Sequence, residues 1–79
     1  MVTRWQDRIT VDPGVQGGKP IIKGTRLSVE FVILLLARGL SVRDLLTQYD
    51  HLAAEDIHAC LAYAGELLKS ERFDPVPAL

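Results

Sequence analysis

Cys60, His51 and His58 are the side chains whose types could support nucleophilic or metal chemistry. A catalytic thiolate needs a neighbouring base, and His58 lies two residues from Cys60 on an expected helix. Side chains at i and i+2 of a helix point in different directions, so His58 is not placed to act as that base. One cysteine and two histidines at these spacings also match no zinc pattern. The sequence therefore predicts no enzyme, no metal and no cofactor, and it predicts a buried Cys60 thiol with a raised pKa.

The glycine-rich segment 14–20 has some features of a phosphate-binding loop, in which backbone amides surround the phosphates and a Ser or Thr follows the Lys. Pro13 stands where the first glycine of that motif belongs, and the residue after Lys19 is Pro20, which has no hydroxyl. The residues that follow predict a strand instead of a helix. We therefore expect a turn here and no small-molecule substrate.

Basic and acidic side chains are unevenly distributed along the 79 residues, which carry a formal net charge of -1. Residues 1–28 contain five basic and two acidic side chains, whereas residues 29–79 contain four basic and eight acidic ones. This asymmetry predicts either an anionic partner for the first part and a cationic partner for the second, or only a solvated surface. Any nucleic acid would be bound weakly, through contacts with its phosphates. The candidate residues for this binding are Lys19, Lys23, Arg26 and Arg43.

The elements that position these residues begin with two short strands near residues 9–11 and 21–23, which are β-branched runs bounded by turn-forming residues. The connection is too long for a two-residue hairpin, so turns are expected at Pro13-Gly14 and Gly17-Gly18. The hairpin therefore precedes the helical part of the chain.

Three helices are expected to follow, near residues 29–38, 42–49 and 54–70. Ser28 and Ser41 are suitable N-caps for the first two helices. The first helix is apolar nearly all round, so we expect it to be buried on most sides. It has more apolar surface than two short neighbours can cover, and this excess predicts a homodimer.

The last helix carries two different faces. The first is an apolar stripe formed by Ile57, Cys60, Leu61, Ala64, Leu67 and Leu68. The second is formed by small or aromatic residues, which are Ala59, Ala62, Tyr63 and Gly65. This second face either packs on a partner chain or lies inside its own domain. The candidate interface residues are Ala59, Ala62, Tyr63, Glu66 and Phe73.

The length and composition predict one domain over residues 1–70, followed by an extended tail over residues 71–79. The longest apolar run, Phe31 to Ala37, is too short to span a membrane. Met1 to Gln6 lacks the apolar centre of a signal peptide. We therefore expect a cytoplasmic protein with no membrane partner.

The second and third helices, with the turn between them, have the order of a helix-turn-helix unit, in which the last helix would recognise bases. Glu55 and Asp56 stand at the start of that helix, where DNA phosphates would repel them. We therefore expect the fold without base recognition by the last helix.

Five blocks of the sequence form a pattern that belongs to a known family. These blocks are Ile9 to Pro13, Gly17 to Val29, Gly39 to Ser41, Glu55 to Ile57 and Ala62 to Ala64. They resemble the short bacterial and archaeal "domain of unknown function 433" family. The resemblance implies a mainly α fold, in which a homeodomain-like three-helix bundle, often dimeric, follows a short N-terminal β-hairpin. Ala53 departs from the pattern, because members usually carry Thr or Ser there as the N-cap of the last helix.

Members of this family are often described as VapB-type antitoxins encoded beside a small PIN-like ribonuclease toxin. The resemblance therefore implies an antitoxin of a type II toxin–antitoxin pair, which inhibits such a toxin and binds its own promoter DNA as a dimer. Two alternatives remain open, a stand-alone DNA-binding transcriptional regulator and a dimeric structural module of other function. The tail around Phe73 either contacts the toxin or is a frayed terminus with no role.

Overall fold

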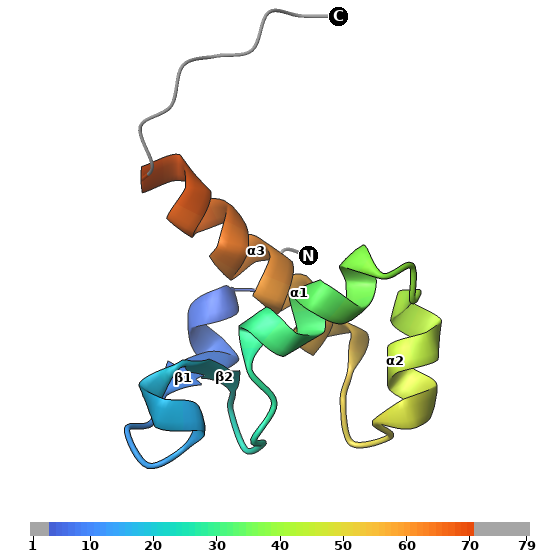
Figure 1. Cartoon of the computed structure of the whole chain (residues 1–79), viewed down its shortest axis with the longest axis horizontal. Helices are drawn as coiled ribbons and strands as arrows, with labels where there is room; N and C mark the ends of the chain where they lie inside the picture. Colours follow the sequence, from blue (N-terminus) through green and yellow to red (C-terminus); the bar gives the residue numbers. More distant parts are fainter. Residues whose placement is uncertain (1–3, 71–79) are drawn as a thin grey trace, which may run out of the picture.

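A computed structural model describes residues 4–70 of the chain, and most of these residues are helical (Figure 1). The 3-10 helix η1 (Trp5–Asp7) leads into strand β1 (Ile9–Val11), 3-10 helix η2 (Gln16–Gly18) and strand β2 (Pro20–Ile22). The helices α1 (Val29–Ala37), α2 (Val42–Gln48) and α3 (Ala54–Ser70) follow. The predicted mainly α fold, with helices after a short N-terminal β-hairpin, is confirmed.

The two strands pair antiparallel, with Ile9 opposite Ile22 and Val11 opposite Pro20. Strand β2 begins and ends one residue earlier than the predicted 21–23. It ends at Ile22 because the carbonyl of Ile22 accepts two hydrogen bonds from Thr25. The backbone N–H of Thr25 donates one at 3.0 Å, and its side-chain hydroxyl donates the other at 2.8 Å. These two bonds turn the chain away from the sheet toward α1.

Serine side chains begin the first two helices, as the sequence predicts. The Ser28 hydroxyl accepts the backbone N–H of Phe31 at 3.0 Å. Ser41 and Asp44 form a reciprocal capping box, with distances of 3.0 and 2.8 Å. Helices α1 and α2 each end one residue before the predicted end, because Arg38 and Tyr49 are already the C-caps.

Helix α1 is less buried than its composition predicts. Only Val29 and Val32 are fully buried, whereas Phe31 and Leu34 expose 39% and 52% of their surface. One side of the helix packs on β2 and on α3. On the outer side, the ring of Phe31 meets the ring of Tyr49 edge-to-face, with centroids 6.3 Å apart, while Leu34 stays exposed. Within residues 4–70 the helix is therefore not buried on most sides, whereas the expectation that its neighbours leave apolar surface uncovered is met.

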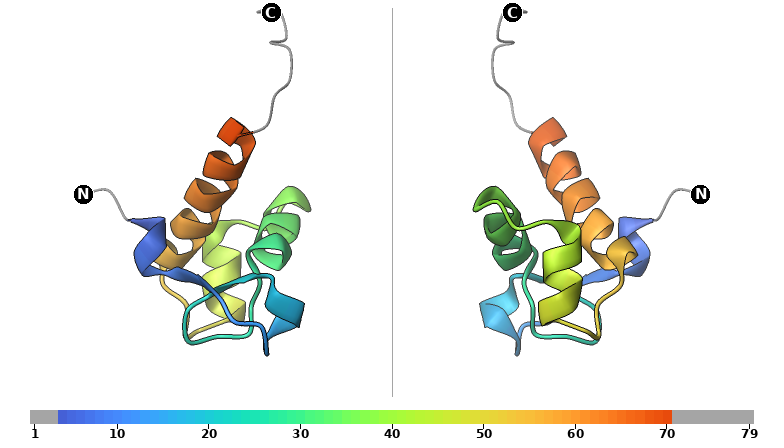
Figure 2. Two further views of the ribbon diagram at one scale, coloured as in Figure 1. Left: turned by 90° about the vertical axis from the view of Figure 1, so that its left-hand side faces the viewer. Right: turned by 90° about the vertical axis from the view of Figure 1, so that its right-hand side faces the viewer.

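Helix α3 enters the core only with its first half. Ile57, Ala59 and Cys60 are completely buried, whereas Leu67 and Leu68 expose 53% and 60% of their surface. Figure 2 shows the reason from two sides, because the second half of α3 extends beyond the elements that pack around its first half. The predicted apolar stripe of this helix is therefore buried at Ile57 and Cys60 and exposed toward the C-terminal end.

Candidate interaction surfaces

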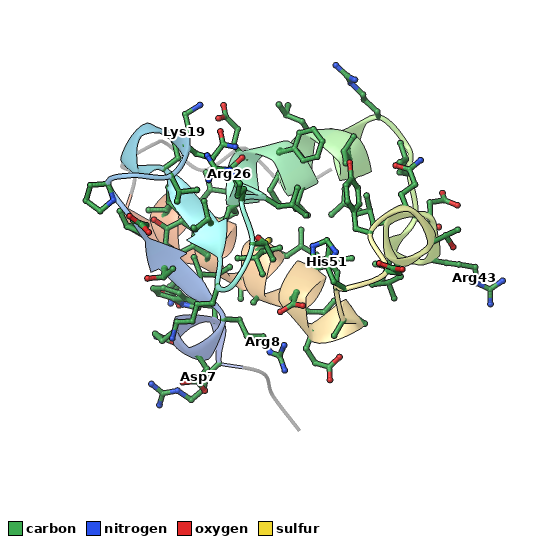
Figure 3. The ribbon with its side chains drawn as sticks, turned by 90° about the horizontal axis from the view of Figure 1, so that it is seen from below. Asp7, Arg8, Lys19, Arg26, Arg43 and His51 are labelled. Carbon is green, nitrogen blue, oxygen red and sulfur yellow. The ribbon has the colours of Figure 1, made fainter. Side chains whose placement is uncertain are left out.

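The basic side chains predicted to bind nucleic acid lie in two separate places (Figure 3). Lys19 and Arg26 lie close together near η2 and the start of α1, whereas Arg43 projects from α2 at the opposite end. Lys23 is exposed in the turn directly after β2. The structure therefore brings Lys19 and Arg26 to one edge and does not bring Arg43 to it.

Local contacts hold this basic edge in place. The ammonium group of Lys19 lies 2.7 Å from a carboxylate oxygen of Glu30, and both side chains are more than half exposed. The side-chain amide of Gln16 donates a hydrogen bond of 2.9 Å to the backbone carbonyl of Arg26. An exposed ion pair of this kind contributes little to stability, so Lys19 can exchange Glu30 for a phosphate at small cost.

The start of α3 forms an ion pair with a residue between η1 and β1. A guanidinium nitrogen of Arg8 lies 2.9 Å from Oδ1 of Asp56, whose side chain is mostly buried. The other oxygen of Asp56 accepts the backbone N–H of Ala53 at 2.9 Å. Asp56 is therefore already paired, and Glu55 is the exposed acidic residue of this first turn.

Two apolar hollows adjoin each other along the outer side of α1. The first has a volume of about 300 Å³ and lies between η2 and α1, with Arg26, Leu27 and Phe31 in its lining. The second has a volume of about 260 Å³ and lies between α1 and α3, with Ile33, Ala64 and Leu67 in its lining. Glu30 and Leu34 line both hollows, so they form the ridge that separates them.

The predicted interface face of the last helix is partly used by the chain itself. Ala59 is fully buried in the core, so its expected role in a partner interface is wrong. Tyr63 packs edge-to-face on Trp5, with ring centroids 4.9 Å apart, and this contact fixes η1 against α3. Ala62 is exposed, and Glu66 lies 3.9 Å from the ammonium group of Lys69. Phe73 lies outside the described residues.

The composition of α1 predicts an uncovered apolar surface, but it does not say which side chains face outward. Eight of its nine residues are apolar, yet the sequence pattern placed the candidate interface on the last helix instead. A helix of this kind has apolar residues at every position of its circumference, so some must face outward unless other elements surround it. Phe31 and Leu34 are these residues, and they belong to the candidate interface.

Cys60 and His58, the residues with catalytic potential, differ in their burial. Burial raises the pKa of the Cys60 thiol to about 12, with a smaller contribution from the negative charge of Asp56. His58 is exposed on the same helix while Cys60 is enclosed, so the two side chains do not meet. Within residues 4–70, no group of three His, Cys, Asp or Glu side chains is arranged to hold a metal ion. None of the helices in this range has the length and hydropathy needed to cross a bilayer.

The fold and its surfaces define a small α-helical domain with a β-hairpin and an exposed apolar helix. Residues 9–64 match the family described as "Protein of unknown function (DUF433)", which is most of the chain. The chain therefore belongs to the DUF433 family.

A relative and a solved structure agree with this assignment. The protein y4eO from Sinorhizobium fredii (strain NBRC 101917 / NGR234) is 38% identical over 56 residues, which are 71% of this chain and 25% of that protein. The crystal structure of a DUF433 member protein from Anabaena variabilis ATCC 29413 is 33% identical. It superposes with a TM-score of 0.76 over 81% of this chain and 63% of that chain. The chain thus spans about a quarter of the length of the curated relative that it matches.

Proposed function

We propose that this protein is the antitoxin of a type II toxin–antitoxin pair. It acts in the cytoplasm without catalysing a reaction, binds and inhibits a PIN-like ribonuclease toxin, and binds its own promoter as a dimer. The observation that carries the proposal is the exposed apolar surface around Phe31 and Leu34, since contiguous apolar surface of this kind on a small protein marks a protein contact, and it supports the dimer. The toxin as the further partner rests on the resemblance to a family whose members are often described as VapB-type antitoxins.

The test of this function is to co-express the chain with the product of the adjacent gene. We expect the two proteins to purify together and the ribonuclease activity of the partner to be blocked in the complex. Separate elution of the two proteins with undiminished ribonuclease activity would contradict the proposal. An adjacent reading frame with several spaced Asp residues, as metal-dependent nucleases need, is the matching observation at the level of the gene neighbourhood.

The tail that follows α3 is the segment proposed to contact the toxin. Its sequence places Phe73 between Glu71 and Asp74, a combination suited to a basic RNA-binding surface with Phe73 as the apolar anchor. Truncation after Lys69 is expected to weaken both co-purification and inhibition. Full inhibition by the truncated chain would assign the contact to the basic edge instead.

Promoter binding is proposed to use the basic edge of Lys19 and Arg26, together with Lys23 in the exposed turn after β2. Simultaneous replacement of Lys19, Lys23 and Arg26 by Ala is expected to weaken binding of all DNA sequences alike, and each lost phosphate contact should lower the salt slope by about one. Arg43→Ala is the matched single control, because this side chain lies at the opposite end of the domain. Undiminished DNA binding by the triple variant would contradict this assignment.

A stand-alone DNA-binding regulator is the second candidate function. The observation that favours it is the ion pair between Arg8 and Asp56, which neutralises one of the two acidic side chains at the start of α3. The remaining acidic side chain, Glu55, still faces solvent, so we place DNA contacts on the basic edge. A DNA complex with Glu55 or His58 against base edges would favour the regulator over our assignment of the contacts.

A further inference from the structure

Two residues of α1 and its C-cap residue lie along one stripe of the helix. Glu30, Leu34 and Arg38 follow one another at i, i+4 and i+8, which places them on the same face. All three are exposed, and Leu34 is the centre of the stripe. The two hollows flank Leu34 on either side. The outer side of α1 is therefore a ridge between the two hollows. Helices pack on each other by placing the ridge of one helix in a groove of the other.

The charges of this stripe are symmetric about Leu34. Glu30 and Arg38 each lie about 6 Å along the helix axis from Leu34, at a rise of 1.5 Å per residue. Glu30 stands in the first turn and Arg38 at the C-cap, where each favours the helix dipole. Within residues 4–70, Glu30 pairs with Lys19 at the surface and Arg38 has no ion pair.

We infer that a second copy of this chain covers the outer side of α1, with the two α1 helices crossing antiparallel at Leu34. The inference rests on the dimer in the proposed function and adds its surface and register; it uses neither the toxin nor DNA.

A two-fold axis at Leu34 brings the two leucines together and lets each ridge enter a groove of the other copy. The same axis brings Glu30 of each copy toward the partner's Arg38.

The charge pattern selects this arrangement over the parallel one. Parallel helices in register would place the two Glu30 side chains together and the two Arg38 side chains together, which costs free energy. The antiparallel pair replaces these repulsions by two opposite-charge contacts. Burial of Phe31, Leu34 and Leu67 would then supply the apolar centre that a dimer of a small domain needs.

Sedimentation equilibrium of the full chain tests the surface. Leu34→Glu is expected to raise the dissociation constant of the dimer by about tenfold or more, because it places two charges at the centre of the interface. Ala62→Glu is the control, since Ala62 is exposed on α3 and lines neither hollow. Circular dichroism verifies that both variants are folded. If Ala62→Glu dissociates the dimer and Leu34→Glu does not, the interface lies on α3 and the inference is overturned.

A charge exchange tests the register independently. Glu30→Arg and Arg38→Glu are each expected to weaken the dimer, and the double variant is expected to restore it, because the opposite charges face each other again. Lys19→Ala should leave the dimer intact, which separates the contact between copies from the ion pair within one chain. Additive loss in the double variant would overturn the antiparallel register. A monomeric wild-type chain would overturn the dimer itself, while inhibition of the toxin is measured separately and can still succeed.

Discussion

At the scale of single residues, the start of α3 has half of a capping box. Asp56 accepts the backbone N–H of Ala53 at 2.9 Å, but Ala53 has no side-chain oxygen to accept a backbone N–H in return. Ala53→Ser is therefore expected to raise the free energy of unfolding by about 0.5–2 kcal/mol, measured by urea denaturation. Ala62→Ser, at an exposed position inside the same helix, should give no such gain. An unchanged urea midpoint for Ala53→Ser would show that the missing cap has no cost.

The complete capping box of α2 makes a part of the stability depend on pH. Hydrogen bonds from the backbone N–H and the hydroxyl of Ser41 lower the pKa of Asp44 below its usual value of 3.8. A carboxyl group whose pKa is lower in the folded state stabilises the fold when it is ionised. This contribution is present above pH 3.8 and is lost as the pH falls through the folded-state pKa. Wild type should therefore be more stable than Asp44→Ala at neutral pH.

The difference between these two proteins should shrink in acid, when denaturation is followed from neutral pH to well below 3.8. A difference that stays constant over this range would contradict the role of ionised Asp44 in the cap.

Residue-scale predictions from sequence succeed where the partners are neighbours in the chain. Ser28, Ser41 and Asp44 are recognised as caps because each contacts a backbone group only three residues away. The ion pair between Arg8 and Asp56 joins residues 48 positions apart, and no local pattern indicates it. Distant pairs of this kind depend on how the hairpin packs on α3.

At the scale of elements, η1 is attached to α3 by an aromatic contact. The rings of Trp5 and Tyr63 meet edge-to-face, at an angle of 71°. A double-mutant cycle with Trp5→Leu and Tyr63→Leu is expected to give a coupling free energy of about 0.5–1.5 kcal/mol, from urea unfolding at one protein concentration. Leucine keeps much of the apolar surface, so the cycle isolates the ring geometry. Strictly additive losses would mean that η1 and α3 pack independently.

The elements themselves are predictable from periodicity, but their burial is not. The bounds of α3 match the predicted 54–70, because its apolar pattern and its acidic first turn are local. The exposure of Leu67 and the burial of Ala59 depend on which elements reach each half of this helix. For α1, an apolar circumference gives the sequence no preferred inward face, so the outward position of Leu34 follows only from the fold.

At the scale of the whole molecule, residues 4–70 leave α1, their most apolar helix, only half covered. The exposed side of α1 and the basic edge of Lys19 and Arg26 meet along the Lys19–Glu30 ion pair. A second copy of the chain on the apolar side would therefore lie next to any nucleic acid on the basic edge. This adjacency gives a physical route for dimerisation to change DNA binding, which the proposed autoregulation requires.

The most direct test of the proposed function is a titration of the ribonuclease encoded by the adjacent gene with the purified full chain. RNA cleavage is followed at constant ribonuclease concentration. Our account predicts that cleavage falls to background when the chain reaches a stoichiometric amount. Cleavage that continues at the full rate in a large excess of folded chain would contradict the antitoxin function.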